Sequence, residues 1–255
     1  MPQANNSHAA LRLLTDPPQA GAMNMALDEA LLEHIGQGSS PPTLRLYRWS
    51  PPTISLGYFQ AYEEYESLPP PAGELAVVRR LTGGGAILHD LELTYSLTLP
   101  NEHLLLSDGP TALYGKAHAV FVRALAALGV EAVPRGECDE DSVRRGPFFC
   151  FSRQHRDDLV LGSGKLAGSA QRRTRTAVLQ HGSVILGSRF EQQECAPAGL
   201  EVSDERIRQL TAAICTEFVK STELTLQPGQ WSDAEIARAA ELRAKYESDE
   251  WNRLR

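Results

Sequence analysis

Two residues that could carry a group-transfer reaction, a cysteine and a lysine, lie close together in the chain. The stretch from residue 148 to 173 reads FFCFSRQHRDDLVLGSGKLAGSAQRR and contains Cys150 and Lys165. A cysteine thiolate is a strong nucleophile that can hold an acyl group as a thioester. A lysine ammonium beside it would favour the thiolate, whereas a desolvated neutral lysine could act as a base. The aromatic residues of FFCF favour a packed, inert thiol, so the local sequence leaves both interpretations open.

The residues that follow Lys165 are small. Gly168, Ser169 and Ala170 belong to the segment GKLAGSAQ, where we expect a strand. Such a strand offers a long side chain little apolar surface to cover and leaves space for a ligand, so these three residues are candidates for substrate binding. A hydrated lysine at the end of a strand is the alternative interpretation.

A second candidate site is the glycine-rich segment RRLTGGGAILHD. Consecutive glycines are costly in chain entropy and are tolerated where the backbone turns sharply or approaches a ligand. Backbone N–H groups in such a turn can bind a carbonyl oxygen or a phosphate, while the alternative is an ordinary hairpin turn. Neither the GK[ST] of a Walker loop nor the GxGxxG spacing of a dinucleotide site is present. The charged neighbours favour a site, with the candidates Arg80, Gly83, Gly84, Gly85 and His89.

The other cysteines and a strand histidine are weaker candidates. Cys138 and Cys195 lie next to acidic residues, which suppress thiolate formation, and Cys215 lies in an apolar helical stretch. His181 in LQHGSVIL is a candidate for substrate binding, although a lone histidine in a strand is more often structural. No CxxC pair occurs, so the sequence predicts neither a zinc ribbon nor a thioredoxin-type site, and we expect no metal site.

Composition and charge exclude several classes of protein. The chain has 255 residues, 42% of them hydrophobic, and a formal net charge of −7, so we expect no nucleic-acid partner. No run is long enough for a transmembrane helix and the N-terminus lacks a secretory signal, so we expect no membrane partner and a cytoplasmic location. Arg172, Arg173 and Arg175 form a basic run in this acidic chain, which is either a hydrated turn or a docking patch for an acidic carrier protein.

These candidates must be held by the elements that the hydrophobic pattern predicts. We expect strands at residues 9–14, 43–49, 51–58, 74–79, 86–89, 94–99, 158–161, 165–170 and 177–186. We expect helices at residues 21–38, 61–68, 111–129, 203–220 and 232–251. Tyr95, Leu97 and Leu99 alternate with Ser96 and Thr98, which is typical of a half-buried strand.

Capping residues place the ends of the longer helices. Gly129 is expected to end the central helix, Ser203 to cap the next one, and Ser232 with Glu235 to form a capping box at the last one. No repeat or interdomain linker is visible. We therefore expect one α+β domain over residues 1–255, with a mixed β-sheet and flanking helices. Its core would cover about residues 10–222 and a C-terminal helical extension about residues 231–255.

Four segments together resemble the biotin/lipoate protein ligase superfamily. MNMALDEALLE, RRLTGGGAILHD, GKLAGSAQ and LQHGSVIL occur in the order and at the intervals of that family, and the resemblance runs from about residue 10 to the C-terminal KYESDEWNRLR. It implies the catalytic-domain fold of the superfamily. It also implies an acyl group bound near the glycine turn and Lys165.

Within the superfamily the chain is most similar to the cysteine-dependent octanoyltransferases of the Gram-positive type. HDLELTYS follows the glycine turn where many ligases have HDxGN, and Cys150 precedes GKLAGSAQ in the position of their catalytic cysteine. The resemblance implies that an octanoyl group moves from octanoyl-acyl carrier protein to Cys150. It then passes to a lysine of a lipoyl domain or of the glycine-cleavage H protein, without a cofactor. Lys165 would favour the thiolate, and the FFCF aromatics would be candidate walls for the acyl chain.

Two other functions fit the same motifs. An ATP-dependent lipoate ligase would use ATP and Mg and hold an acyl-adenylate with Lys165. A non-catalytic module would keep the fold and bind lipoyl domains without turnover. Supply of free lipoate and ATP without carrier protein separates the ligase from the transferase, and binding without transfer identifies the module.

Overall fold

The computed structural model describes residues 10–136, 147–153 and 155–255. Its strands are β1 (Ala10–Thr15), β2 (Thr43–Tyr47), β3 (Thr53–Leu56), β4 (Ala76–Arg79), β5 (Ile87–His89), β6 (Glu92–Pro100), β7 (Val133–Pro134), β8 (Leu159–Leu161), β9 (Gly164–Arg173), β10 (Ala177–Ile185) and β11 (Thr225–Pro228). Its helices are α1 (Gly21–Gly36), α2 (Tyr62–Glu66), α3 (Ala112–Ala126), α5 (Asp204–Thr222), α6 (Asp233–Glu247) and α7 (Asp249–Asn252). Three short 3-10 turns complete the described elements: η2 (Ala72–Glu74), η3 (Leu104–Leu106) and η4 (Cys150–Ser152).

The main sheet is mixed, as the sequence predicts. Its order is β11-β1-β2-β6-β10-β9-β8-β7, and β1 runs parallel to both β11 and β2. The pairs from β2 through β6, β10, β9 and β8 to β7 are antiparallel. A second sheet of order β4-β3-β5 lies beside it and carries the glycine-rich segment between β4 and β5. The predicted α+β class with a mixed sheet and flanking helices is confirmed.

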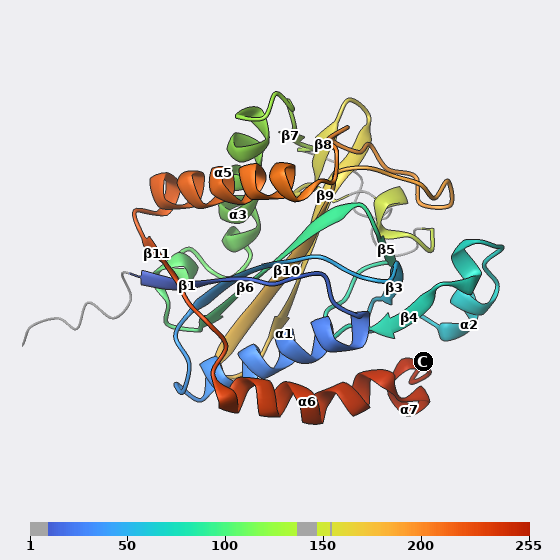
Figure 1. The fold of residues 1–255 in the computed structure, drawn as a ribbon, viewed down its shortest axis with the longest axis horizontal. Helices are drawn as coiled ribbons and strands as arrows, with labels where there is room; N and C mark the ends of the chain where they lie inside the picture. The colour runs from blue at the N-terminus through green and yellow to red at the C-terminus, as the bar shows by residue number, and fades with distance from the viewer. Residues whose placement is uncertain (1–9, 137–146, 154) are drawn as a thin grey trace, which may run out of the picture.

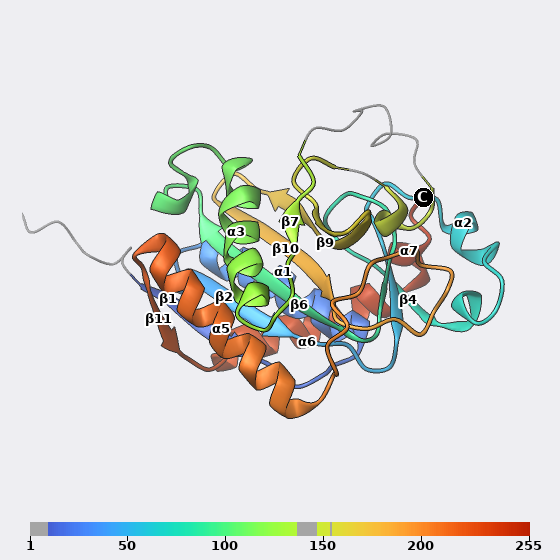
Figure 2. The ribbon, with the colours of Figure 1, turned by 90° about the horizontal axis from the view of Figure 1, so that it is seen from above.

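Helices cover both faces of the main sheet (Figure 1). Seen from above in Figure 2, α3 and α5 lie on one face of the sheet and α1 and α6 on the other. The C-terminus lies at the end of the molecule that carries α2 and β4, away from α5, in both views. This layered arrangement leaves the junction of the two sheets at one end of the molecule, where the candidate residues gather.

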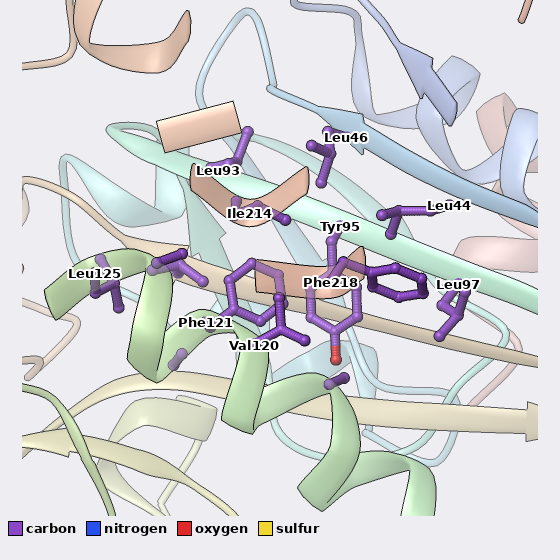
Figure 3. Packing of buried hydrophobic residues seen from close by; sticks show 14 of the residues in the cluster. Leu44, Leu46, Leu93, Tyr95, Leu97, Val120, Phe121, Leu125, Ile214 and Phe218 are labelled. Carbon is purple, nitrogen blue, oxygen red and sulfur yellow. The ribbon is translucent and has the colours of Figure 1, made fainter. Parts of the chain in front are cut away.

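Amphipathic helices build the apolar layer between α3, α5 and the sheet. Figure 3 shows Val120 and Phe121 of α3 and Ile214 and Phe218 of α5 gathered around the strand residue Tyr95. These side chains belong to one buried cluster, whose further members include Leu44, Leu46, Leu93, Leu97 and Leu125. The apolar stripe predicted for the central helix is therefore confirmed, and burial of this stripe is what holds α3 to the sheet.

The prediction of a half-buried strand at β6 is wrong. Ser96 and Thr98, on the polar face, are both fully buried because α1 covers that face. A polar group meets Ser96 there: Ser96 Oγ donates a hydrogen bond of 2.9 Å to Asp28 Oδ1 of α1. Thr98 Oγ1 is buried without a hydrogen-bond partner among the described residues. In a sheet with one face in water, alternating polar and apolar residues indicate which face is solvated. In β6 the polar residues instead form a buried layer beneath α1.

The predicted helix caps agree with the structure. Ser203 Oγ accepts from the N–H of Arg206 at the start of α5. Ser232 and Glu235 form the expected capping box of α6, and Arg12 of β1 donates to Glu235 Oε1 at 2.6 Å. This ion pair fixes the buried start of α6 to the sheet.

No helix in the described part of the chain is long and apolar enough to cross a membrane.

Candidate active site

The structure brings Cys150 and Lys165 into contact. Cys150 begins the turn η4 and Lys165 is the second residue of β9. Lys165 Nζ lies 3.3 Å from Cys150 Sγ and 3.2 Å from the Cys150 carbonyl oxygen. It also forms an ion pair of 2.9 Å with Asp158 Oδ1, just before β8. A buried cation therefore faces the thiol from one side and a carboxylate holds that cation from the other.

Lys165 is not a hydrated lysine at a strand end, because its exposed fraction is 3%. Burial by itself lowers the pKa of a lysine, but the charges of Cys150 and Asp158 outweigh it, so the pKa of Lys165 lies above its ordinary value. The side chain is therefore an ammonium at neutral pH. An ammonium in this position would stabilise a thiolate by charge, and it has no free lone pair with which to act as a base.

The glycine in GKLAGSAQ makes room for the lysine itself. A Cβ at Gly168 would lie 2.6 Å from Lys165 Cε and 2.8 Å from its Nζ. The expectation from the sequence was that the small residues leave space for a ligand. Gly168 also lines the cavity described below. Its main effect, however, is steric: without a side chain at this position, Lys165 can reach Cys150.

The glycine turn lies directly against the cysteine segment. The N–H of Cys150 donates to the Ala86 carbonyl at 2.7 Å, and the N–H of Ala86 donates to the Phe148 carbonyl at 2.9 Å. A Cβ at Gly85 would lie 2.9 Å from the Cys150 nitrogen, so this close approach requires glycine. Gly84 has a φ of +94°, which other residues rarely adopt. The glycines of the turn therefore have two effects. Gly84 allows the left-handed backbone conformation, and Gly85 allows the turn to approach the Cys150 backbone.

Arg80 holds the glycine turn in shape. One of its terminal nitrogens donates to the carbonyls of Gly83 and Gly85, each at 2.7 Å, and the other donates to the Ser55 carbonyl at 2.9 Å. Burial lowers the pKa of Arg80 to about 10, so the group stays charged at neutral pH. Its hydrogen bonds go to the protein backbone, so Arg80 acts first as a support for the turn.

A relay of hydrogen bonds runs from Arg80 to Asp28 of α1. Arg80 Nε donates to Thr82 Oγ1 at 3.0 Å, and Thr82 Oγ1 lies 2.7 Å from His181 Nε2. His181 Nδ1 in turn lies 3.0 Å from Asp28 Oδ2. The Thr82 hydroxyl and the Asp28 carboxylate thus hold one ring nitrogen of His181 each. His181 of β10 thereby has a fixed ring orientation.

The carboxylate at the end of this relay is buried and well partnered. Asp28 is 1% exposed, and burial alone would raise its pKa. Arg45, at 2.7 Å, and His181 outweigh burial and hold the pKa of Asp28 below its ordinary value. Tyr47 donates a further hydrogen bond of 2.9 Å, and burial raises the pKa of this tyrosine well above its ordinary value, so it remains a donor.

A second relay starts from the same arginine and ends at His89. Arg80 also donates to Ser55 Oγ at 3.2 Å, and Ser55 Oγ lies 2.8 Å from His89 Nε2. His89 Nδ1 faces Glu92 Oε1 at 3.4 Å, and its ring stacks on Trp49 at a centroid distance of 3.8 Å. Burial lowers the pKa of His89, so this imidazole is neutral. Both candidate histidines are thus oriented by hydroxyl groups that Arg80 fixes.

Ser169 belongs to a third polar group. Its hydroxyl lies 2.7 Å from Tyr95 OH and 2.7 Å from His118 Nε2. Burial lowers the pKa of His118, and its Nδ1 is hydrogen-bonded to the carbonyl of Asp157, so Nε2 is the acceptor for Ser169. This group connects β9 to α3.

A cavity that is open to solvent lies where the two sheets meet. Its lining contains nine of the predicted residues, namely Arg80, Gly83, Gly84, His89, Cys150, Gly168, Ser169, Ala170 and His181. Lys165 and Gly85 lie behind this lining and contact Cys150. The predicted site residues therefore come together from segments far apart in the sequence.

The apolar walls of the cavity were not predicted. Met25, Tyr47, Trp49 and Ile87 supply them, and in the sequence these residues look like ordinary core positions. The expectation that the FFCF aromatics form the walls is wrong. Phe149 packs in the cluster around Leu56 and Leu88, and neither Phe149 nor Phe151 lines the cavity, although both are buried.

Two acidic residues of the site were also missed. Asp28 lies in MNMALDE and Asp158 in HRDDLVL. Each could have been suspected from one signal, which is a carboxylate on the apolar side of a helix or at the start of a buried strand. Their partners could not be named from the sequence, because His181 and Lys165 reach them only in the folded chain.

Cys195 and Cys215 do not line the cavity. Burial raises the pKa of Cys195 and of Cys215 and disfavours their thiolates. Cys138 lies outside the described residues. Within the ranges that the structure describes, no group of three or more histidine, cysteine, aspartate or glutamate side chains could hold a metal ion.

Sequence and structure comparisons agree on the relatives of the chain. Residues 20–213 match the family described as the lipoyl protein ligase A/B catalytic domain. A relative from Geobacillus kaustophilus, named Octanoyltransferase LipM, is 36% identical over 260 residues, which are 91% of this chain and 93% of the relative. A protein of the same name from Staphylococcus aureus is 32% identical over 255 residues, 89% and 92% of the two chains.

Solved structures show the same fold. A protein from T. acidophilum, described as a lipoate protein ligase with bound lipoic acid, aligns with a TM-score of 0.76 and 25% identity, covering 96% of this chain and 99% of its own. A lipoate-protein ligase A bound with ATP aligns with a TM-score of 0.76 and 24% identity over 96% and 98% of the two chains. The resemblance expected from the four motifs is confirmed, and the chain belongs to the lipoyl protein ligase A/B catalytic-domain family.

Proposed function

We propose that this acyltransferase moves an octanoyl group from octanoyl-acyl carrier protein to a lysine of a lipoyl domain or of the glycine-cleavage H protein, through a thioester on Cys150. The observation that carries the proposal is the 3.3 Å distance between Lys165 Nζ and Cys150 Sγ at the wall of an apolar cavity. The names of the curated relatives, Octanoyltransferase LipM, support the acyl group. A buried cation beside a thiol favours the nucleophilic thiolate.

In the first half of the reaction the Cys150 thiolate attacks the carbonyl carbon of the carrier-bound octanoyl thioester. A bond forms between Cys150 Sγ and that carbon, the bond to the carrier sulfur breaks, and the carrier leaves as a thiolate that takes a proton from solvent. Thioester exchange is close to balanced in free energy, so this step requires no ATP. The octanoyl chain then lies along the apolar walls that Met25 and Trp49 provide.

The glycine turn supplies the best candidate donors for the oxyanion of each tetrahedral intermediate. Among the described residues, the backbone N–H groups of Gly83, Gly84 and Gly85 have no hydrogen-bond acceptor, while Arg80 holds the Gly83 and Gly85 carbonyls. Residues 168–170 are paired with β10, which favours the turn over β9 for this role. Removal of one such donor typically lowers a rate by about 10²–10³.

In the second half the neutral ε-amine of the acceptor lysine attacks the thioester on Cys150. The carbon–nitrogen bond forms, the carbon–sulfur bond breaks, and the amine releases a proton to solvent. The thiolate that leaves returns to the side of Lys165, whose positive charge stabilises it. Formation of an amide from a thioester is downhill, so this half draws the cycle forward.

A comparison of two acyl donors tests the proposal against an ATP-dependent ligase. Octanoyl-acyl carrier protein with an apo lipoyl domain, without ATP, is expected to give octanoylated domain. Free octanoate or lipoate with ATP and Mg is expected to give none. Efficient lipoylation from the free acid, with no transfer from the carrier, would replace the proposal by the ligase. Binding of the domain without transfer under both conditions would identify a non-catalytic module.

A further inference from the structure

The mouth of the cavity carries an exposed aromatic ring. Phe59 is 70% exposed, more than any other large hydrophobic side chain among the described residues. It contacts the glycine turn, because a Cβ at Gly83 would lie 3.8 Å from the Phe59 ring. Since Gly83 lines the cavity, this ring stands beside the entrance to the site. Exposed aromatic side chains next to a functional cleft are typical of a binding surface.

One arginine contacts this ring, and two more contact its neighbours Tyr58 and the glycine turn. The guanidinium of Arg255 lies 5.4 Å from the Phe59 ring and 5.4 Å from the Tyr58 ring, and that of Arg172 lies 5.7 Å from the Tyr58 ring. Arg153 packs against Gly85 of the same turn. We call Tyr58, Phe59, Arg153, Arg172 and Arg255 the mouth patch. It joins the ends of β9, the glycine turn and the C-terminal segment.

The arginines of the mouth patch lack a side-chain carboxylate partner among the described residues. Arg153, Arg172 and Arg255 form no ion pair with a carboxylate there, although the chain as a whole has a net charge of −7. Several exposed cations elsewhere are paired, as in Arg189–Asp90, Arg208–Glu205, Lys220–Glu217, Arg243–Glu247 and Arg253–Glu66. Arg156, Arg173 and Arg175 are exposed without an ion pair among the described residues, but no aromatic contact joins them to the cavity mouth. An unpaired basic and aromatic surface on an acidic protein is complementary to an acidic partner.

We propose that the mouth patch is the docking surface for an acidic acceptor domain, whose target lysine enters the cavity between Phe59 and Arg153. The inference rests on the proposed function for the identity of the reaction. The position of the patch selects the acceptor over the acyl carrier protein. A lysine side chain is a short stem, so its domain must place its backbone at the rim of the cavity. A pantetheine arm is several times longer and allows its carrier to dock at a distance.

The predicted effect is on association and depends on salt. Charged groups at the rim of an interface mainly change the rate of encounter. The double variant Arg172→Glu with Arg255→Glu is expected to lower the second-order rate of transfer from octanoylated protein to an acidic lipoyl domain by about tenfold at low salt. The loss shrinks at about 0.5 M salt, where screening shortens the range of the interaction to a few ångströms. Phe59→Ser lowers the rate at both salt concentrations.

The control is a second double variant with the same change in net charge. Arg206→Glu with Arg208→Glu changes α5, which lies away from the C-terminus in both Figure 1 and Figure 2, and is expected to transfer at the wild-type rate. Equal loss in the patch and control variants would show an effect of net charge alone and overturn the proposal. Slower loading from octanoyl-acyl carrier protein with unchanged transfer to the domain would also overturn it, in favour of a donor surface.

A binding measurement separates this inference from the proposed function. The affinity of a Cys150→Ala protein for the apo lipoyl domain is measured by calorimetry with and without the patch reversal. If the wild-type protein transfers no octanoyl group, the proposed function fails. Weaker binding upon patch reversal, with unchanged binding in the α5 control, still supports the docking surface. Equal affinity in all three proteins overturns the docking surface, whatever the result of the transfer assay.

Discussion

At the scale of single residues, the contact between Cys150 and Lys165 depends on groups that hold the ammonium in place. Asp158 binds it at 2.9 Å, and the absence of a side chain at Gly168 leaves it space. Because the lysine is buried, water cannot stabilise its charge if that charge is moved or loses its partner. A substitution of Asp158 or of Gly168 would do one or the other. The charge beside the proposed nucleophile therefore depends on Asp158 and Gly168 for its position.

The substitution Gly168→Ala tests this dependence. The new methyl group would lie 2.6 Å from Lys165 Cε and must push the ammonium away from Cys150. We expect octanoyl transfer to fall by about 10²-fold, which is the order of loss of one preorganised electrostatic group. Steady-state transfer rates measure it. Gly115→Ala is the control: its Cβ meets nothing within 4 Å inside α3, so transfer should remain unchanged. Unchanged transfer in Gly168→Ala would show that the ammonium position is unimportant.

Replacement of the cation itself gives a second prediction. Lys165→Met keeps much of the length of the side chain but removes the charge that favours the thiolate. At neutral pH we expect Cys150 to react at least about tenfold more slowly with iodoacetamide, and transfer to fall with it. Lys220→Met, an exposed lysine of α5, should leave both rates unchanged. Equal alkylation rates in wild type and Lys165→Met would contradict the role given to Lys165.

At the scale of elements, the two relays from Arg80 tie α1 and β10 to the glycine turn and β5. The order of motifs was enough to predict that the turn, Cys150, Lys165 and His181 share a site. The relays could not be predicted, because Asp28 and His181 are 153 residues apart in the sequence and meet only through packing of α1 on the sheet. For the same reason Met25 and Trp49 looked like core residues, although the junction of the two sheets turns them toward the cavity.

The start of α6 allows a test of how an element is held. Glu235 is fully buried; burial alone would raise its pKa, but bonds from Arg12, Ser232 and Ser40 lower it to about 2. Because the pKa in the folded protein lies below the unfolded value of 4.5, the ionised Glu235 carboxylate stabilises the fold above pH 4.5. This contribution is lost as the pH falls toward 2. Glu235→Gln is therefore expected to cost about 3 kcal/mol of unfolding free energy at pH 7 and progressively less below pH 4.5.

Denaturant unfolding at several pH values measures this difference. Glu247→Gln is the matched change at the other end of α6, in an exposed pair with Arg243, and should cost less than about 0.5 kcal/mol at every pH. A loss in Glu235→Gln that is the same at pH 3 and pH 7 would contradict the electrostatic explanation. It would indicate that shape, and not charge, holds the start of α6.

At the scale of the whole molecule, the fold places the Cys150 thiol where the two sheets meet, and each sheet contributes some of the groups around it. The main sheet contributes Lys165 and the polar wall from β9 and β10. The second sheet contributes the glycine turn, whose residues Gly83 and Gly84 line the same cavity as Cys150. The predicted fold class and most predicted cavity residues agree with this arrangement. The prediction that the FFCF aromatics line the cavity does not agree with it, because Phe149 is buried in the core of the second sheet.

The central claim is that Cys150 carries the acyl group. Its most direct test is the intact mass of the protein after incubation with octanoyl-acyl carrier protein in the absence of ATP. We expect one added octanoyl group on the wild-type protein, removed by hydroxylamine, no adduct and no transfer with Cys150→Ala, and little activity with Cys150→Ser. A wild-type protein without an adduct, together with full transfer by Cys150→Ala, would contradict the thioester mechanism.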